Sequence, residues 1–281
     1  MPLSDLVRPF ISSRTLVHVG SLALLIGVYS LIPTLKEISS YKDVGDMPSQ
    51  VHTALSLVLG CLLVFRTNTA YGRWWEARTL WGALVNATRN LAIKVRCLAP
   101  LTSEEKASLR KQLTLFPKVL VEHLRHVPSR VGSSREDGGS SDWDHRPAET
   151  VHKIYQWLAK AKSDGRIDGD ALRVIDMELA KLLDVCGGCE RIARTPIVRS
   201  YRIFARQCTV LFLLTFPWGI ANDFGWWTIP MTTISAYFML GMEIVAEDVE
   251  DPFGLDEDDL DLEGLCVTIE RSVNEILGAT S

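Results

Sequence analysis

Residues 51–78, VHTALSLVLGCLLVFRTNTAYGRWWEAR, decide the fold of this chain. The first half of the stretch is mainly apolar, and the second half brings Arg66, Arg73 and Arg78 together with aromatic residues. Proline is absent from it. Arginine and tryptophan at the end of an apolar run are typical of the cytosolic membrane surface. We therefore expect one long helix that crosses a bilayer and continues into the cytosol.

The apolar part of this helix carries a stripe of three side chains. Leu57, Cys61 and Phe65 are spaced by four residues, which places them on one helical face. The apolar part is also shorter than the roughly 20 residues of a lipid-facing span, which favours contact with other helices or with water. Such a stripe either packs against neighbouring helices or lines a narrow constriction that gates ions by dewetting. Spacing by itself favours ordinary packing, and both interpretations stay open at this point.

Three further apolar runs complete a membrane topology. Residues 15–33 form the first span, which we expect to end at Pro33. Residues 208–221 and 226–245 form a second hairpin. Arginine is dense in residues 190–206, and residues 207–270 contain neither lysine nor arginine, so the hairpin begins on the cytosolic side. The sequence thus predicts a multi-pass protein of the lipid bilayer with four spans and both termini cytosolic, in the inner membrane if the organism is bacterial.

The remaining segments are helical in pattern, so the expected fold class is an all-α membrane protein with a large helical cytosolic region. We divide the chain by composition into four parts. They are the N-terminal segment with the first hairpin (1–82), the cytosolic helices (83–206), the second hairpin (207–246), and the acidic segment with a C-terminal cytosolic helix (247–281).

Composition and motifs exclude several functions. The net charge of −4 gives no basic signal for nucleic acid. Nucleotide-binding glycine loops, serine-hydrolase elbows and HExxH metal motifs are absent from the sequence, and its six histidines are scattered. Cys186 and Cys189 form a CxxC without a second ligand pair, which we interpret as structural thiols. We therefore expect neither an enzyme nor a bound organic cofactor.

An acidic run follows the second hairpin. Residues 243–263 contain eleven carboxylates and no lysine or arginine. Their mutual repulsion is on the order of a kcal/mol for each close pair at a surface. Solvation, the arginine-rich segments, or a hard cation such as Ca²⁺ with oxygen ligands would offset it.

Three motifs together resemble the bestrophin family, in particular its prokaryotic members. They are FRTNTAYGRWWEAR (65–78), ERIARTPI (190–197) and EDPFGLDEDDLDL (250–262), in the family's order. The resemblance implies a homopentamer with four membrane helices per subunit, in which the second membrane helix lines a central pore. It places the hydrophobic neck of that pore at Leu57, Cys61 and Phe65, where Cys61 is smaller than the bulky residue expected. A second constriction at the cytosolic exit falls on Ile192, with Ala193 and Arg194 as neighbouring choices.

The resemblance also bears on calcium and on ion type. Animal members bind Ca²⁺ after Pro-Phe-Gly, and Asp256 and Asp259 occupy the matching positions, whereas Leu255 replaces an acid. The implied function is a passive channel that conducts chloride and other small anions. A sodium-selective channel of the same fold is the alternative, and a non-conducting membrane scaffold is the alternative from another class.

Overall fold

The computed structural model describes residues 14–40, 45, 48–126, 144–256 and 258–278. Over these residues the regular structure is helical, which confirms the all-α prediction. Two compact units are formed, the first from residues 1–72 and 197–250 and the second from residues 73–196 and 251–281. We call the first the membrane unit, because it contains most of the candidate membrane spans, and the second the cytosolic unit, after its expected location. The two units are described separately below. The boundaries predicted from composition remain predictions.

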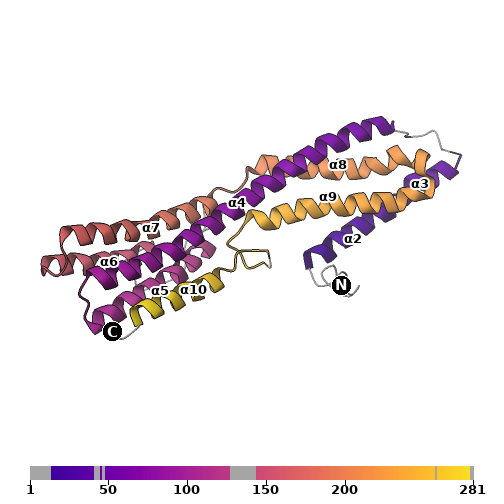
Figure 1. Cartoon of the computed structure of the whole chain (residues 1–281). Helices are drawn as coiled ribbons and strands as arrows, with labels where there is room; N and C mark the ends of the chain where they lie inside the picture. Colours follow the sequence, from indigo (N-terminus) through magenta and orange to yellow (C-terminus); the bar gives the residue numbers. More distant parts are fainter. Residues whose placement is uncertain (1–13, 41–44, 46–47, 127–143, 257, 279–281) are drawn as a thin grey trace. The chain divides into compact units, whose positions relative to one another are not determined.

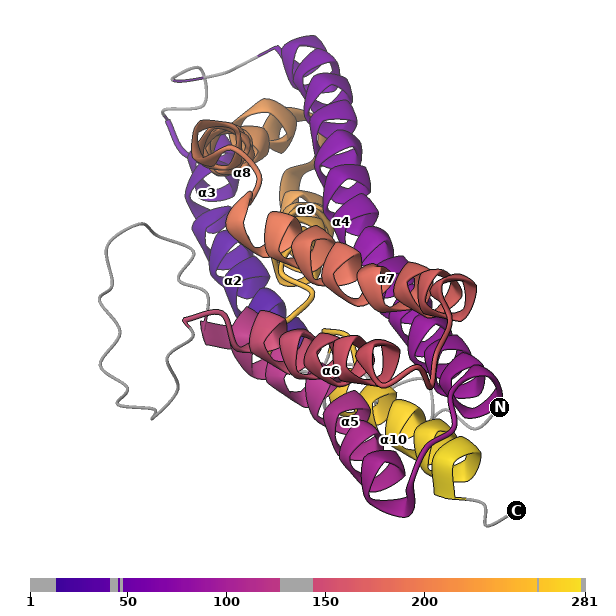
Figure 2. The same ribbon diagram turned by 90° about the vertical axis from the view of Figure 1, so that its left-hand side faces the viewer.

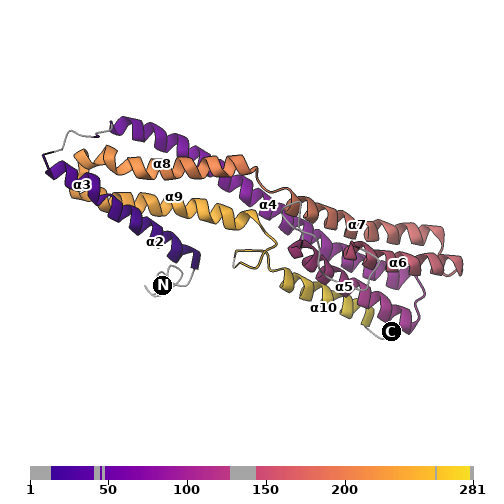
Figure 3. The same cartoon turned by 180° about the vertical axis from the view of Figure 1, so that it is seen from behind.

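Among the residues that the structure describes, three segments are long and apolar enough to cross a membrane: Leu16–Ile38, Ser49–Leu98 and Arg199–Glu250. The third contains two helices, α8 (Arg199–Phe224) and α9 (Thr228–Glu250), joined by the short 3-10 helix η1 (Gly225–Trp227). Figures 1 and 3 show α8 and α9 side by side. Gly225 allows the reversal because its φ of 52° lies in the left-handed region that favours glycine.

Helix α2 (Arg14–Tyr29) packs along α9 within the membrane unit. Close approach depends on Gly27, because a Cβ atom there would overlap with the hydroxyl oxygen of Thr233. The prediction that the first span ends at Pro33 is wrong. The helix breaks after Tyr29, and Pro33 lies in the first turn of α3 (Leu31–Ile38), where the missing N–H breaks no helical bond.

The long helix predicted from residues 51–78 is present as α4 (Ser49–Leu98), which contributes to both units. The cytosolic unit adds α5 (Ser103–His126), α6 (Arg146–Ser163), α7 (Gly169–Arg194) and α10 (Leu262–Gly278). Figure 2 shows α10 beside α5, and its buried stripe includes Ile269 and Val273. The core of the unit contains the fully buried Trp81, Leu91 and Phe116.

The sequence Thr102-Ser103-Glu104-Glu105 predicts a capping box at the start of α5, and the structure confirms it. Glu105 N–H donates to Thr102 Oγ1 (3.2 Å), and Thr102 N–H donates to Glu105 Oε2 (3.0 Å). Arg166 also contacts both carboxylate oxygens of Glu105, at 2.8 and 2.9 Å. The backbone hydrogen bond from Thr102, with the help of Arg166, lowers the pKa of Glu105 to about 2.

We expect Glu105→Gln to change the acid sensitivity of the protein. The pKa of Glu105 in the folded state lies below its usual 4.5. The stabilisation is therefore fully present above pH 4.5 and is lost as the pH falls toward 2. Thermal unfolding of the full chain across this range should show a steeper loss for wild type than for Glu105→Gln. Equal pH slopes would contradict the role of the carboxylate, and Glu104→Gln, one residue earlier, is the matched control.

Candidate functional site

The rotation of α4 in the membrane unit is set by a buried stripe. The stripe consists of buried residues that recur every three to seven positions: His52, Leu59, Leu63, Arg66 and Ala70. Leu59 and Leu63 pack in a cluster with Phe212 and Leu213 of α8. This face of α4 therefore packs against its own chain. The same packing determines which residues of α4 lie on the opposite face.

The predicted neck stripe lies on that opposite face. Leu57, Cys61 and Phe65 each stand two residues, or about 200° of helical rotation, from a member of the buried stripe. Leu57 is 72% exposed and Phe65 is 67% exposed, and Cys61 is exposed as well. The stripe thus does not pack within this chain, and it is available to a pore, to lipid or to another subunit. Its assignment as a neck stays a prediction.

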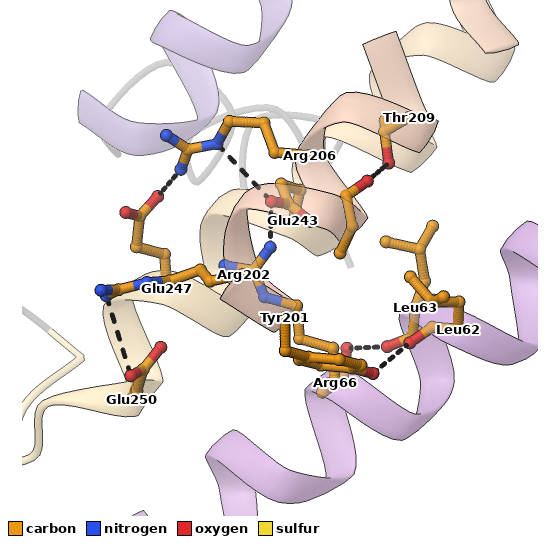
Figure 4. Close-up of polar contacts among 12 residues, drawn as sticks. Leu62, Leu63, Arg66, Tyr201, Arg202, Arg206, Thr209, Glu243, Glu247 and Glu250 are labelled. Carbon is orange, nitrogen blue, oxygen red and sulfur yellow. Dashed lines mark hydrogen bonds and ion pairs between the residues drawn. The ribbon is translucent and has the colours of Figure 1, made fainter. Parts of the chain in front are cut away.

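A buried ion pair ties α4 to α9 one residue after Phe65. Arg66 Nη1 contacts Glu243 Oε1, and the side chains are 1% and 4% exposed (Figure 4). Arg66 Nε, Arg66 Nη2 and Glu243 Oε2 are also buried and make no hydrogen bond to the described residues. Paired charges inside a membrane unit are costly to remove singly and are common at functional sites. Sequence reasoning missed this pair, although an arginine at the end of one apolar run and an acid inside another are a usable signal.

Two arginines of α8 pair with further carboxylates of α9, and one of them, Arg206, joins the Arg66–Glu243 pair. Arg206 lies 3.7 Å from Glu243 and 2.5 Å from Glu247, and Arg202 lies 3.8 Å from Glu250. Figure 4 shows these side chains converging between the two helices. Arginine pairing therefore offsets the first carboxylates of the acidic run.

The residue predicted to form the exit constriction lies in the cytosolic unit. Ile192 is 3% exposed and packs in the core of that unit, whereas Arg194 is exposed. Arg73 of α4 donates to the carbonyl oxygens of Ile192 (2.8 Å) and Thr195 (2.5 Å), which satisfies the end of α7. A side chain that lines an exit must face solvent, so this geometry favours Arg194 over Ile192. The constriction itself stays a prediction.

Asp256 and Asp259, the residues predicted for calcium, belong to one turn. Asp259 Oδ2 accepts a hydrogen bond from Asp256 N–H at 2.6 Å, and Asp256 is exposed. The same oxygen would lie 2.5 Å from a Cβ atom at position 254, so any larger residue there would displace the Asp259 carboxylate. The Asp259 carboxylate thus has a structural role here, and calcium binding stays a prediction.

The CxxC cysteines are free thiols on α7, both buried. Burial raises the pKa of Cys186 and of Cys189 to about 12. A thiol with such a pKa is a poor nucleophile, in agreement with the structural interpretation. A second feature of this region is a cluster of His123, His145 and Glu190. Sequence reasoning missed it, because the three residues are far apart in the chain.

Comparisons with known proteins agree with this fold. The profile of the family described as bacterial and fungal bestrophin protein matches residues 5–275. A protein of Synechocystis sp. named voltage-dependent anion channel-forming protein is 33% identical over 96% of this chain and 88% of its own length. A protein of the same name from Mesorhizobium japonicum is 35% identical over 84% of this chain and 77% of its own length.

A solved structure has the same fold. It is that of a bacterial bestrophin homologue from Klebsiella pneumoniae, with a TM-score of 0.83 at 24% identity, and the match covers 95% of this chain and 100% of its own. Likeness at this identity shows the fold, whereas the profile and the two relatives show the family. This chain therefore belongs to the bacterial and fungal bestrophin family.

Proposed function

We propose that this chain is one subunit of a passive anion channel whose pore is lined by the first half of α4. The observation that carries the proposal is the stripe of Leu57, Cys61 and Phe65, which is apolar and exposed opposite the buried stripe. The uncovered apolar face of such a helix is covered either by lipid or by a partner subunit, and we propose the partner. Five copies arranged around an axis supply it, with one α4 stripe from each subunit.

The proposed topology has four crossings, by α2, the first half of α4, α8 and α9. The arginine-rich segment 190–206 lies on the cytosolic side, as do both termini. In a bacterium the protein would reside in the inner membrane. Ions would lose part of their hydration at the apolar neck and leave through a constriction at residues 192–194.

The names of the relatives support anions over cations, because they describe anion channel-forming proteins. Charge does not separate the two ions, because the arginines and the carboxylates pair with one another. Glu243, Glu247 and Glu250 are each within 4.0 Å of an arginine, and Arg191 and Arg194 are paired with Glu76 and Glu190. Chloride is the anion that we propose, and a sodium channel of the same fold is the alternative.

We expect a planar-bilayer recording of the purified protein in asymmetric NaCl to reverse near the chloride equilibrium potential. The expectation rests on the relatives, whose names describe anion channel-forming proteins. Reversal near the sodium equilibrium potential would replace the proposal with the cation channel. The absence of current together with a monomer or dimer in detergent would support the scaffold instead, and a silent five-copy assembly would be recorded again with Ca²⁺. Bilayers that receive detergent without protein are the control.

A further inference from the structure

Three potential metal ligands meet in the cytosolic unit. His123 Nε2 lies 2.5 Å from Glu190 Oε1, and His145 Nε2 lies 2.9 Å from the same oxygen. The three ligand atoms are all within 4.8 Å of one another. They are brought together from α5, from the residue before α6, and from α7.

Local structure places each ligand. Glu190 follows Cys186 by one helical turn, so both project from the same face of α7. The Sγ atom of Cys186 lies 4.0 Å from His145 Nε2, so this thiol borders the three ligand atoms. His145 is the N-cap of α6, and its Nδ1 accepts the Ala148 N–H at 3.1 Å. His123 is buried, and the His145 side chain is 35% exposed, which leaves the cluster an access path from solvent.

The spacing of the ligands suits a transition metal. Bonds of about 2.0–2.2 Å around tetrahedral zinc place neighbouring ligand atoms about 3.3 Å apart. Each imidazole therefore needs to move away from Glu190 by less than about 1 Å, and the two imidazole nitrogens, which lie within 4.8 Å of each other, need to approach by at most about 1.5 Å. Two imidazoles with one carboxylate, next to a thiol, match the preferences of Zn²⁺, whereas Ca²⁺ takes oxygen ligands.

We propose that His123, His145 and Glu190 form a Zn²⁺-binding site in the cytosolic unit. The site is separate from the pore stripe and from Asp256 and Asp259, and the proposal does not depend on conduction.

The competing interpretation is a structural hydrogen-bond cluster without metal. Since His145 Nδ1 accepts a hydrogen bond, the neutral ring carries its proton on Nε2 and donates it to Glu190. Zinc would take the Nε2 lone pair, move that proton to Nδ1 and break the cap of α6. Zinc binding thus exchanges the two imidazole–Glu190 hydrogen bonds and the cap of α6 for three metal–ligand bonds, which are individually stronger, so zinc binding is favoured.

The competing interpretations differ in a measurable way. Purified full-length protein, stripped with a chelator and dialysed against ZnCl₂, should retain about one zinc per chain by elemental analysis. A hundredfold excess of CaCl₂ should leave this zinc in place, because the donors are nitrogen-rich. The proposal would be overturned if the wild-type protein retained no more zinc than the ligand variants described in the next paragraph.

Three variants test the ligands while preserving the fold. His145→Asn keeps a good N-cap residue but removes the imidazole, and Glu190→Gln and His123→Gln preserve side-chain size. Each should weaken zinc binding by at least about tenfold. His152→Ala, an exposed histidine of α6, is the matched control and should bind like wild type. Wild-type zinc affinity in His145→Asn and Glu190→Gln, or an equal loss in His152→Ala, would overturn the assignment.

Discussion

Phe65→Ala is expected to raise the current through the channel about tenfold, which corresponds to a barrier lower by about 1.4 kcal/mol. Phe65 is a large apolar side chain that is 67% exposed on the face of α4 opposite the buried stripe. An alanine would widen the constriction and let ions keep more of their water. Single-channel recording measures the change as conductance or open probability.

The matched control is Val64→Ala. Val64 is also apolar and exposed, but it is rotated by about 100° from Phe65 around the helix. It should leave the current nearly unchanged. Leu57→Ala should act like Phe65→Ala, and Cys61→Phe should do the opposite, because it adds bulk to the same stripe. Unchanged currents in both alanine variants of the stripe would remove the neck assignment.

Helix position and helix faces could be predicted from the sequence because both follow from local patterns. The apolar run with arginine after it predicted α4, and spacing by four residues placed Leu57, Cys61 and Phe65 together. The capping box at Thr102 and Glu105 gave the start of α5. The position of Pro33 misled the prediction of the first span, because proline also fits the first turn of a new helix.

Partners across helices could not be predicted in the same way. Arg66 and Glu243 are 177 residues apart, and His123 and Glu190 are 67 apart. Periodicity shows that a side chain faces inward, but it does not show which side chain of another helix lies opposite. Ile192 illustrates the limit. The motif ERIARTPI predicted the region of the exit constriction, but only packing against other helices determines that the Ile192 side chain is buried.

Glu243→Ala is expected to destabilise the protein by about 3–5 kcal/mol, because it leaves the Arg66 guanidinium buried without its partner. The pair is nearly inaccessible to solvent, so water cannot replace the lost carboxylate. Thermal unfolding in detergent, followed by tryptophan fluorescence, measures the change. The more exposed ion pair between Glu247 and Arg206 supplies the control. Glu247 and Arg206 are 42% and 54% exposed, and Glu247→Ala should cost less than about 1 kcal/mol.

A double variant separates charge from packing. Arg66→Met with Glu243→Met replaces the two charges by flexible apolar side chains, and it should recover most of the stability lost in Glu243→Ala. A double variant as unstable as the single one would show that shape rather than charge matters at this contact.

Since Arg66 follows Phe65 directly, the pair also holds the rotation of α4 that exposes the neck stripe. If that coupling holds, the double variant should conduct abnormally even though it is stable, whereas Glu247→Ala should conduct like wild type.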